Sequence, residues 1–202
     1  MAINFAACQS LQPSVDTSTE VTGSPVDDST AAVEEDLAKQ VFPNDFEQVC
    51  NGIAFAPAKA YEPTAGSIHH LYVFDRESDS ETFSESYREL PSSWKMEWEE
   101  SQETQLVACL TVTKQAIANA CEFDPDEGQT QGYVLETYDT TYDVALYAAQ
   151  SGELIDSTTF DLSGDDCPVV HFFTEGEYTD SSSANYTQAL IDFVKPYVQP
   201  ES

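Results

Sequence analysis

The chain has 202 residues, of which 37 are acidic and 7 basic, giving a net charge of −30. A surface of this sign repels nucleic acid and anionic membranes, because phosphate binding needs lysine and arginine at the interface. The acidity is typical of a solvated, secreted protein surface and favours cationic partners or divalent ions.

The N-terminus contains a lipobox-like cysteine. Cys8 follows Phe5-Ala6-Ala7, and a stretch rich in Ser, Thr, Pro and Asp comes after it. We therefore predict a lipidated Cys8 and a disordered acidic tether over residues 1–42, with the lipid as the only membrane contact. Only seven residues precede Cys8 and none is basic, whereas a signal peptide has a basic start and an apolar core. Either the true start lies upstream, or the signal has been trimmed, or the motif is accidental.

The folded domain is predicted to span residues 43–202. Its first part reads as a helical turn over 44–49, a loop over 53–61, a buried strand over 70–75 and a half-exposed strand over 94–98. Two apolar runs, 105–113 and 116–123, predict a hairpin that turns near residue 114. Residues 132–148 predict a long strand, because Tyr138, Thr140, Tyr142, Val144 and Leu146 alternate with polar side chains.

The second half closes the sheet and adds a helix. Gly152 marks a hairpin turn over 150–153, followed by strands over 154–162 and 169–173. The last segment predicts a helix capped by Ser182 or Ser183, with one apolar stripe from Tyr186 to Tyr197. The expected fold is α+β: an antiparallel meander of five or six strands, stapled by disulfides, with a C-terminal helix packed on one face.

Four cysteines besides Cys8 suit two disulfide bridges: Cys50, Cys109, Cys121 and Cys167. The preferred pairing is Cys50–Cys109 with Cys121–Cys167, and the competing bridge joins Cys109 to Cys121 across the predicted hairpin. Each preferred bridge closes a loop worth about 4 kcal/mol in the chain-entropy model. Bridges would place the domain outside the cytoplasm, at the cell surface or in a periplasm, whereas reduced thiols would indicate the cytosol.

An ordered set of short motifs extends over residues 49–198. It comprises Cys50-Asn51-Gly52, Ala58-Lys59-Ala60-Tyr61, Leu90-Pro91 with Trp94, Leu106-Val107-Ala108-Cys109, Cys121-Glu122-Phe123, Ser151-Gly152-Glu153-Leu154-Ile155, Cys167-Pro168 and Pro196-Tyr197-Val198. This set resembles an uncharacterised group of bacterial lipoprotein-like or secreted domains. The resemblance implies a disulfide-bonded extracytoplasmic fold and implies neither an activity nor site residues.

Acidic turns supply candidates for a bound calcium ion: Asp124, Asp126, Asp165 and Asp166. An EF-hand opening at Asp124 would need a glutamate where Leu135 stands, so solvated turn acids are the alternative. Adjacent histidines on a strand face opposite sides. His69 and His70 therefore cannot chelate one ion together, and the alternative metal site combines one of them with His171 and an acid. No other cofactor is expected.

No catalytic motif is evident, since the chain lacks a Gly-x-Ser-x-Gly nucleophile elbow. The sequence favours a non-catalytic extracytoplasmic surface or envelope domain, a lipid-anchored binding or accessory module for an unknown protein or polymer of the cell envelope. The alternative is an extracytoplasmic hydrolase that uses carboxylates. Such an enzyme would need a cleft holding two acids, one of them desolvated.

Overall fold

The computed structural model describes residues 40–86, 90–125 and 127–201, within a compact unit that begins at Gln40. Cys8, most of the predicted tether and Asp126 lie outside the described residues. The elements are η1 (Pro43–Asn51), β1 (Leu71–Arg76), β2 (Ser84–Glu85), η2 (Ser92–Trp94), η3 (Trp98–Glu103), β3 (Leu106–Phe123), β4 (Tyr133–Ala148), β5 (Leu154–Leu162), β6 (Thr179–Ser183) and α2 (Thr187–Val198), where η marks a 3₁₀ helix.

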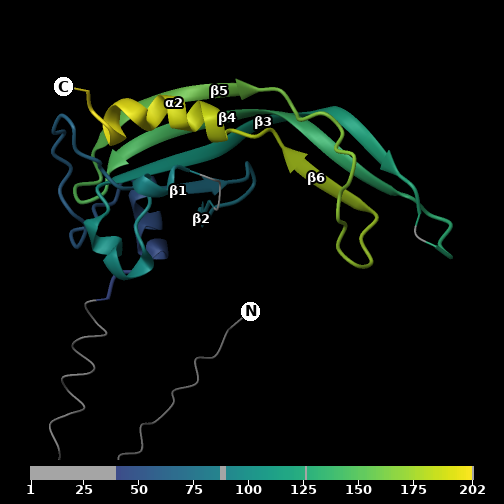
Figure 1. Ribbon diagram of the computed structural model, residues 1–202, viewed down its shortest axis with the longest axis horizontal. Coiled ribbons are helices and arrows are strands. Elements are labelled where there is room, and N and C mark those ends of the chain that lie inside the picture. Colours follow the sequence, from purple (N-terminus) through teal and green to yellow (C-terminus); the bar gives the residue numbers. More distant parts are fainter. Residues whose placement is uncertain (1–39, 87–89, 126, 202) are drawn as a thin grey trace, which may run out of the picture. The chain divides into compact units, whose positions relative to one another are not determined.

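The sheet is mixed, so the predicted antiparallel meander is wrong, although six strands and a C-terminal helix are present. Its order is β2-β1-β3-β4-β5, and β6 pairs with β4. The pairs β1–β3 and β4–β6 are parallel. Long connections explain both cases, because residues 77–105 return the chain to the end of the sheet at which β1 began, and residues 163–178 precede β6. The helix α2 lies along one face (Figure 1).

One continuous strand, β3, replaces the predicted hairpin of two short strands. Its pairing with β4 runs from Leu106 to Phe123 with register shifts between Val112 and Lys114 and between Ile117 and Asn119. The supposed turn near residue 114 is therefore a β-bulge, which adds a residue and twist without reversing the chain. The competing Cys109–Cys121 bridge is excluded as well, because twelve residues of one strand span roughly 40 Å.

The period-2 prediction for residues 132–148 is confirmed by β4. Thr140, Tyr142, Val144 and Leu146 are buried, as expected for one face directed at a core. The strand over 154–162 is confirmed by β5, and Gly152 in the turn has a φ of 69°. Local alternation and turn chemistry were sufficient here, because they depend only on neighbouring residues.

Three other predicted elements differ. Residues 94–98 belong to the 3₁₀ helices η2 and η3 and the link between them, and residues 169–173 form an irregular exposed segment. Ser182 and Ser183 lie in β6 rather than at a helix cap. The Asn185 side chain instead accepts a hydrogen bond from the Thr187 backbone N–H at the start of α2.

Two apolar clusters on opposite faces of the sheet form what we call the body. The first lies between the sheet and α2 and includes Leu106, Leu110, Val144, Leu146, Leu190 and Val194. The second lies under η1 and includes Phe46, Val49, Phe55, Phe74, Val107 and Cys109. The Cys50–Cys109 disulfide lies in this second cluster and ties η1 to β3.

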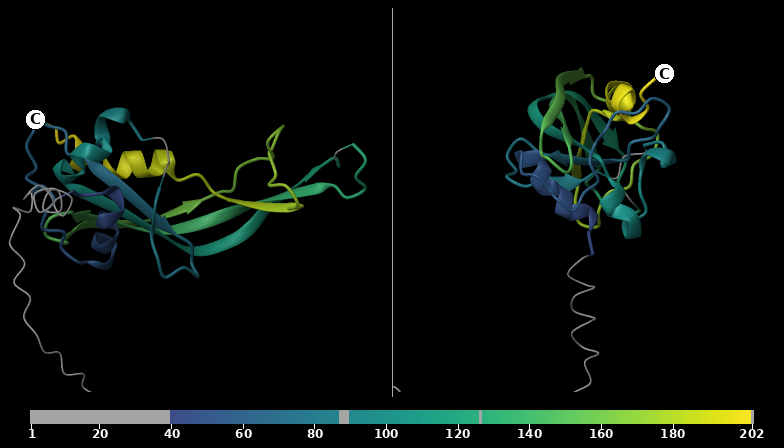
Figure 2. Two further views of the ribbon diagram at one scale, coloured as in Figure 1. Left: turned by 90° about the horizontal axis from the view of Figure 1, so that it is seen from below. Right: turned by 90° about the vertical axis from the view of Figure 1, so that its left-hand side faces the viewer.

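The rest of the sheet extends beyond the body as what we call the arm (Figures 1 and 2). The arm comprises residues 113–123 of β3, residues 133–139 of β4, the strand β6, and a connection over residues 163–178 that we call the strap. The second disulfide, Cys121–Cys167, joins the strap to β3. Both disulfides are thus the pairs that the sequence favoured, and they indicate an oxidising, extracytoplasmic environment.

Candidate functional site

The strap crosses one face of the arm in close contact. Asn119 on β3 donates hydrogen bonds to the Thr137 hydroxyl at 3.2 Å and to the Asp165 carbonyl at 3.3 Å. A β-carbon on Gly164 would lie 2.8 Å from the β-carbon of Ala118, so only glycine fits at this crossing. Leu135 and Thr137 are buried. The strap therefore covers one face of the arm although it has no regular secondary structure.

Aromatic rings fasten the far end of the strap. Phe173 stacks on Tyr133 with a centroid separation of 4.8 Å and meets Phe123 edge-on at 5.5 Å. Tyr133 also stacks on Tyr178 at 5.5 Å. Rings in such offset and edge-on arrangements attract one another beyond simple area burial. The rings thus hold the strap against the arm beyond the disulfide.

Apolar side chains of the strap point away from this cluster. Val169 is 97% exposed and Phe172 is 90% exposed, with Val170 also exposed. Together with half-buried Phe173 they surround a shallow hollow of about 390 Å³. Such a contiguous exposed apolar surface is unusual on a protein with this much charge, because single exposed apolar residues are common but clusters are not.

A second hollow, of about 420 Å³, lies where the arm meets the body. Asp75 and Glu77 from the end of β1 line it, as do Val112 and Gln115 of β3. Arg76, between the two carboxylates in the sequence, lines it too, although its guanidinium donates to the Thr111 hydroxyl at 3.1 Å and lies over the Phe83 ring. The remaining walls come from β4, β6 and the residue before α2: Tyr138, Tyr142, Ser181, Ser182, Ser183 and Tyr186. The arrangement brings two carboxylates into one polar hollow, which the sequence analysis did not anticipate.

The two carboxylates of this hollow have different surroundings. The Tyr186 hydroxyl donates to Asp75 at 2.5 Å. Partial burial, together with the nearby charges of Asp75 and Asp79, raises the pKa of Glu77. The hollow therefore combines a hydrogen-bonded carboxylate with one whose negative charge is disfavoured by its neighbours, and a cation would relieve that repulsion.

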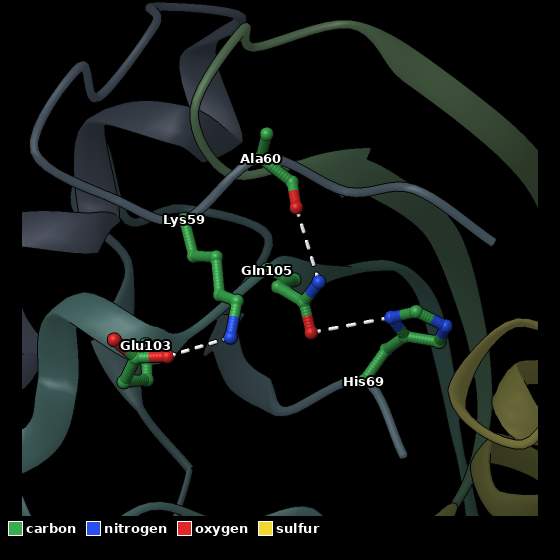
Figure 3. Close-up of polar contacts among 5 residues, drawn as sticks. All are labelled: Lys59, Ala60, His69, Glu103 and Gln105. Atoms are coloured by element: carbon green, nitrogen blue, oxygen red, sulfur yellow. Dashed lines mark hydrogen bonds and ion pairs between the residues drawn. The ribbon is translucent and has the colours of Figure 1, made fainter. Parts of the chain in front are cut away.

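The histidines have structural partners and do not converge. Figure 3 shows the chain of contacts at His69: its Nδ1 lies 3.2 Å from the Gln105 side-chain oxygen, and the Gln105 amide donates to the Ala60 carbonyl at 3.0 Å. The Thr64 backbone N–H donates to Nε2 of His69, so Nδ1 carries the proton in the neutral ring. Beside them, Lys59 pairs with Glu103 at 2.7 Å. This network fastens the loop before β1 onto the start of β3.

The other two histidines also lie apart from one another. His171 lies in the strap, where its Nε2 is 2.8 Å from an Asp180 oxygen. Burial lowers the pKa of His70, which keeps its ring neutral. Among the described residues no three His, Cys, Asp or Glu side chains are grouped to hold a metal. The metal site built on His171 with His69 or His70 is therefore wrong for this part of the chain.

The calcium candidates that the structure describes do not form a group of three metal-ligating side chains. Asp124 follows β3 and is exposed, and Asp165 and Asp166 are exposed strap residues. The Asp165 backbone carbonyl accepts a hydrogen bond from the Asn119 side chain, which holds the strap against β3. Asp126 lies outside the described residues, so the complete set of four stays a prediction.

Sequence reasoning missed the two surfaces that stand out. Residues 169–173 were predicted to be a strand because they are nearly all apolar, and nothing local signals that they lie exposed on a strap. Asp75 and Glu77 differ from the many other acids only through the fold, since a polar hollow forms around them.

Comparison with protein-family models, curated protein sequences and solved structures finds no significant match to this chain. No helix in the described part of the chain is both long and apolar enough to cross a membrane. The resemblance to lipoprotein-like domains consequently stays a hypothesis.

Proposed function

We propose that the chain is a non-catalytic extracytoplasmic binding module that contacts a protein or polymer of the cell envelope through its arm. The observation that carries this proposal is the exposed apolar segment of the strap, with Val169 97% exposed and Phe172 90% exposed. Exposing such side chains to water costs about 25 cal/mol per Å² relative to burial, so a partner that covers them gains free energy.

The architecture of the arm supports the same proposal. A binding surface gains affinity when it is already ordered before the partner arrives. The Cys121–Cys167 disulfide and the stacking of Phe173 on Tyr133 hold the strap from both ends of the apolar segment. Functional residues commonly lie on loops that a rigid scaffold positions.

The test is saturable binding of the full, oxidised chain to an envelope fraction from its own organism. Replacing Val169 and Phe172 by serine is expected to weaken binding at least about tenfold, since two exposed apolar anchors are lost. The matched control replaces two exposed apolar residues of the body, Ile53 and Trp98, by serine and should bind as the parent chain does. Equal binding by all three chains would contradict the proposed role of the strap.

Lipid anchoring is the second part of the proposal. It rests on the small residues before Cys8 and on the even number of cysteines that remain. A mature protein that begins at a lipidated Cys8 would carry a lipid-sized mass increment, and reduction would add four protons to its intact mass. An unlipidated Cys8 in protein isolated from native membranes would refute the anchor and leave the binding proposal in place.

A carboxylate-dependent hydrolase is the second candidate function, favoured by the hollow that holds Asp75 and Glu77. A raised pKa suits Glu77 to the role of general acid, while Asp75, which accepts a hydrogen bond from the Tyr186 hydroxyl, would supply the second carboxyl group. Hydrolysis of envelope polysaccharides by the full chain, abolished in Glu77→Gln and in Asp75→Asn, would establish this function. Turnover that persists in both variants would exclude the pair as the catalytic groups.

A further inference from the structure

The outer edge of β3 loses its partner strand where the arm begins. β1 pairs with β3 from Leu71↔Leu106 as far as Arg76↔Thr111, and then leaves the sheet. On its other side β3 stays paired with β4 to Phe123. Among the described residues no strand pairs with the outer edge of β3 beyond Thr111. Backbone donors and acceptors along this edge are therefore open to an added strand.

The open edge carries few of the features that protect edges from pairing. Residues Thr113 to Ala118 are all exposed, and Lys114 is their one charged side chain. Ile117 is 57% exposed. The two bulges confine regular geometry to Lys114–Ile117, which sets the length of a matching segment at about four residues.

The polar hollow lies at the same place. It is lined by Asp75, Arg76 and Glu77, where β1 departs, and by Val112 and Gln115 of the vacated stretch of β3. The Arg76 guanidinium is engaged by the Thr111 hydroxyl and the Phe83 ring, and within the described residues it forms no ion pair with either carboxylate. A strand that continued along the edge in place of β1 would project alternate side chains toward this hollow. The nearby carboxylates select a positive side chain at that position.

From the open edge and the acidic hollow beside it, we propose that residues 112–118 of β3 bind an extended basic segment of a partner polypeptide by strand addition. The backbone of that segment pairs with Lys114–Ile117, and a lysine or arginine side chain enters the hollow between Asp75 and Glu77. This inference rests on the proposed binding function and names a partner class for it, at a second surface of the arm.

Charge decides between this occupant and a second copy of the chain. Each chain carries a net charge of −30, and pairing two β3 edges would bring two sets of Asp75 and Glu77 together. That repulsion opposes dimers and attracts a basic segment, and both effects weaken with salt. Backbone pairing supplies affinity in strand addition, while the side-chain pocket supplies specificity.

The test uses a nonapeptide of alternating lysine and valine with the full, oxidised chain at low ionic strength. The control peptide has the same sequence with two adjacent central residues N-methylated, so that neither of its edges can pair. We expect the unmodified peptide to bind at least about tenfold more tightly, because methylation removes backbone hydrogen bonds. Amide hydrogen exchange at Lys114–Ile117 should slow on binding.

Matched variants test the hollow separately. Glu77→Gln and Asp166→Asn each replace one carboxyl group by an amide, but only Glu77 lines the hollow. Glu77→Gln is expected to weaken peptide binding about threefold or more, and Asp166→Asn by less than about twofold. A second pair of variants introduces a lysine at an exposed apolar position, either Ile117→Lys on the β3 edge or Leu154→Lys on β5. Only Ile117→Lys should weaken peptide binding, because only Ile117 lies on the proposed binding edge.

Three outcomes would overturn the inference. Equal binding of both peptides would reduce the interaction to non-specific charge attraction. Protection of the β3 edge without peptide, rising with protein concentration and with salt, would identify a second copy as the occupant. Absence of peptide binding up to about 1 mM would reject strand addition by basic segments. In each case the strap variants Val169→Ser and Phe172→Ser still test the proposed binding function independently.

Discussion

The body and the arm are held together by different interactions, although one sheet runs through both. In the body, two apolar clusters enclose side chains such as Leu106 and Leu146, and the Cys50–Cys109 bridge lies within one of them. The arm buries far fewer apolar side chains, with Leu135 and Cys121 under the strap. Burial therefore stabilises the body, whereas the arm depends on its disulfide and a thin layer of rings.

Under the proposed function, the region that stabilises the fold and the region that binds a partner are different. The arm exposes Val169 and Phe172 and leaves the β3 edge without a partner strand in the described chain. Regions with few buried contacts open at lower free energy than a core does. A protein gains from a covalent bond in such a region, because the surface must stay ordered without being buried.

Removing each disulfide in turn is expected to give the largest effect and the clearest contrast. Replacing Cys50 and Cys109 by alanine should lower the global free energy of unfolding by about 4 kcal/mol, the chain-entropy value for a loop of this length. Replacing Cys121 and Cys167 should instead release the arm while the body stays folded. Chemical denaturation would measure the first change, and amide hydrogen exchange in β6 the second.

The body serves as the control for the arm in this comparison. Amides of β5, which pairs with the body part of β4, should keep their protection when Cys121 and Cys167 are replaced. Simultaneous loss of protection in β5 and β6 would show that body and arm unfold as one unit.

The same leucine-to-alanine change in each region sharpens the comparison. Leu190 of α2 is completely buried in the first cluster, and its replacement should cost about 3 kcal/mol of global stability. Leu135 is nearly as buried, but it lies under the irregular strap. The strap can move to fill the cavity that the shorter side chain leaves, so Leu135→Ala should lower the free energy of unfolding by about 2 kcal/mol or less. Thermal unfolding of both variants measures the difference, and a larger loss from Leu135→Ala would contradict our account of the arm.

The parts of the fold that the sequence predicted are those fixed by neighbours along the chain. Alternation in β4 places Thr140, Tyr142 and Val144 on the buried face, and Gly152 supplies the turn before β5. These signals are local, because side-chain direction repeats every two residues and a positive φ is easy for glycine. The preferred disulfide pairing also agrees with the structure, although spacing alone could not select it.

The parts that escaped prediction depend on contacts between distant segments. A break near Lys114 looks like a turn, but continuous pairing with β4 converts it into a bulge. The apolar run from Val169 to Phe173 looks like a buried strand, yet the Cys121–Cys167 bridge leaves it on the surface of the arm. Both candidate surfaces arise in this way, which is why the sequence indicated a binding module without locating its surface.

Two aspartates provide the smallest test, one in each region. Asp180 of β6 accepts hydrogen bonds from His171 at 2.8 Å and from the Ser181 backbone, and these hold its pKa below the usual 3.8. Asp156 of β5 accepts from the Tyr197 hydroxyl and the Ser157 backbone, which lower its pKa as well. The hydrogen bond between Tyr197 and Asp156 also raises the pKa of Tyr197 to about 12.

A lowered carboxyl pKa stabilises the folded state fully above the unfolded-state pKa, and that stabilisation is lost as the pH falls through the folded-state value. Acid should therefore loosen β6 below about pH 4, visible as faster amide exchange near Ser181 relative to intrinsic rates. Asp180→Asn should abolish this acid dependence at a cost of less than about 1 kcal/mol, because the pair is largely exposed. Asp156→Asn should act only near Ser157, since the body holds its neighbours in place. If Asp180→Asn left the acid response of β6 unchanged, the His171 pair would not be what fastens the strap to β6, and the aromatic rings and the disulfide alone would have to hold the arm.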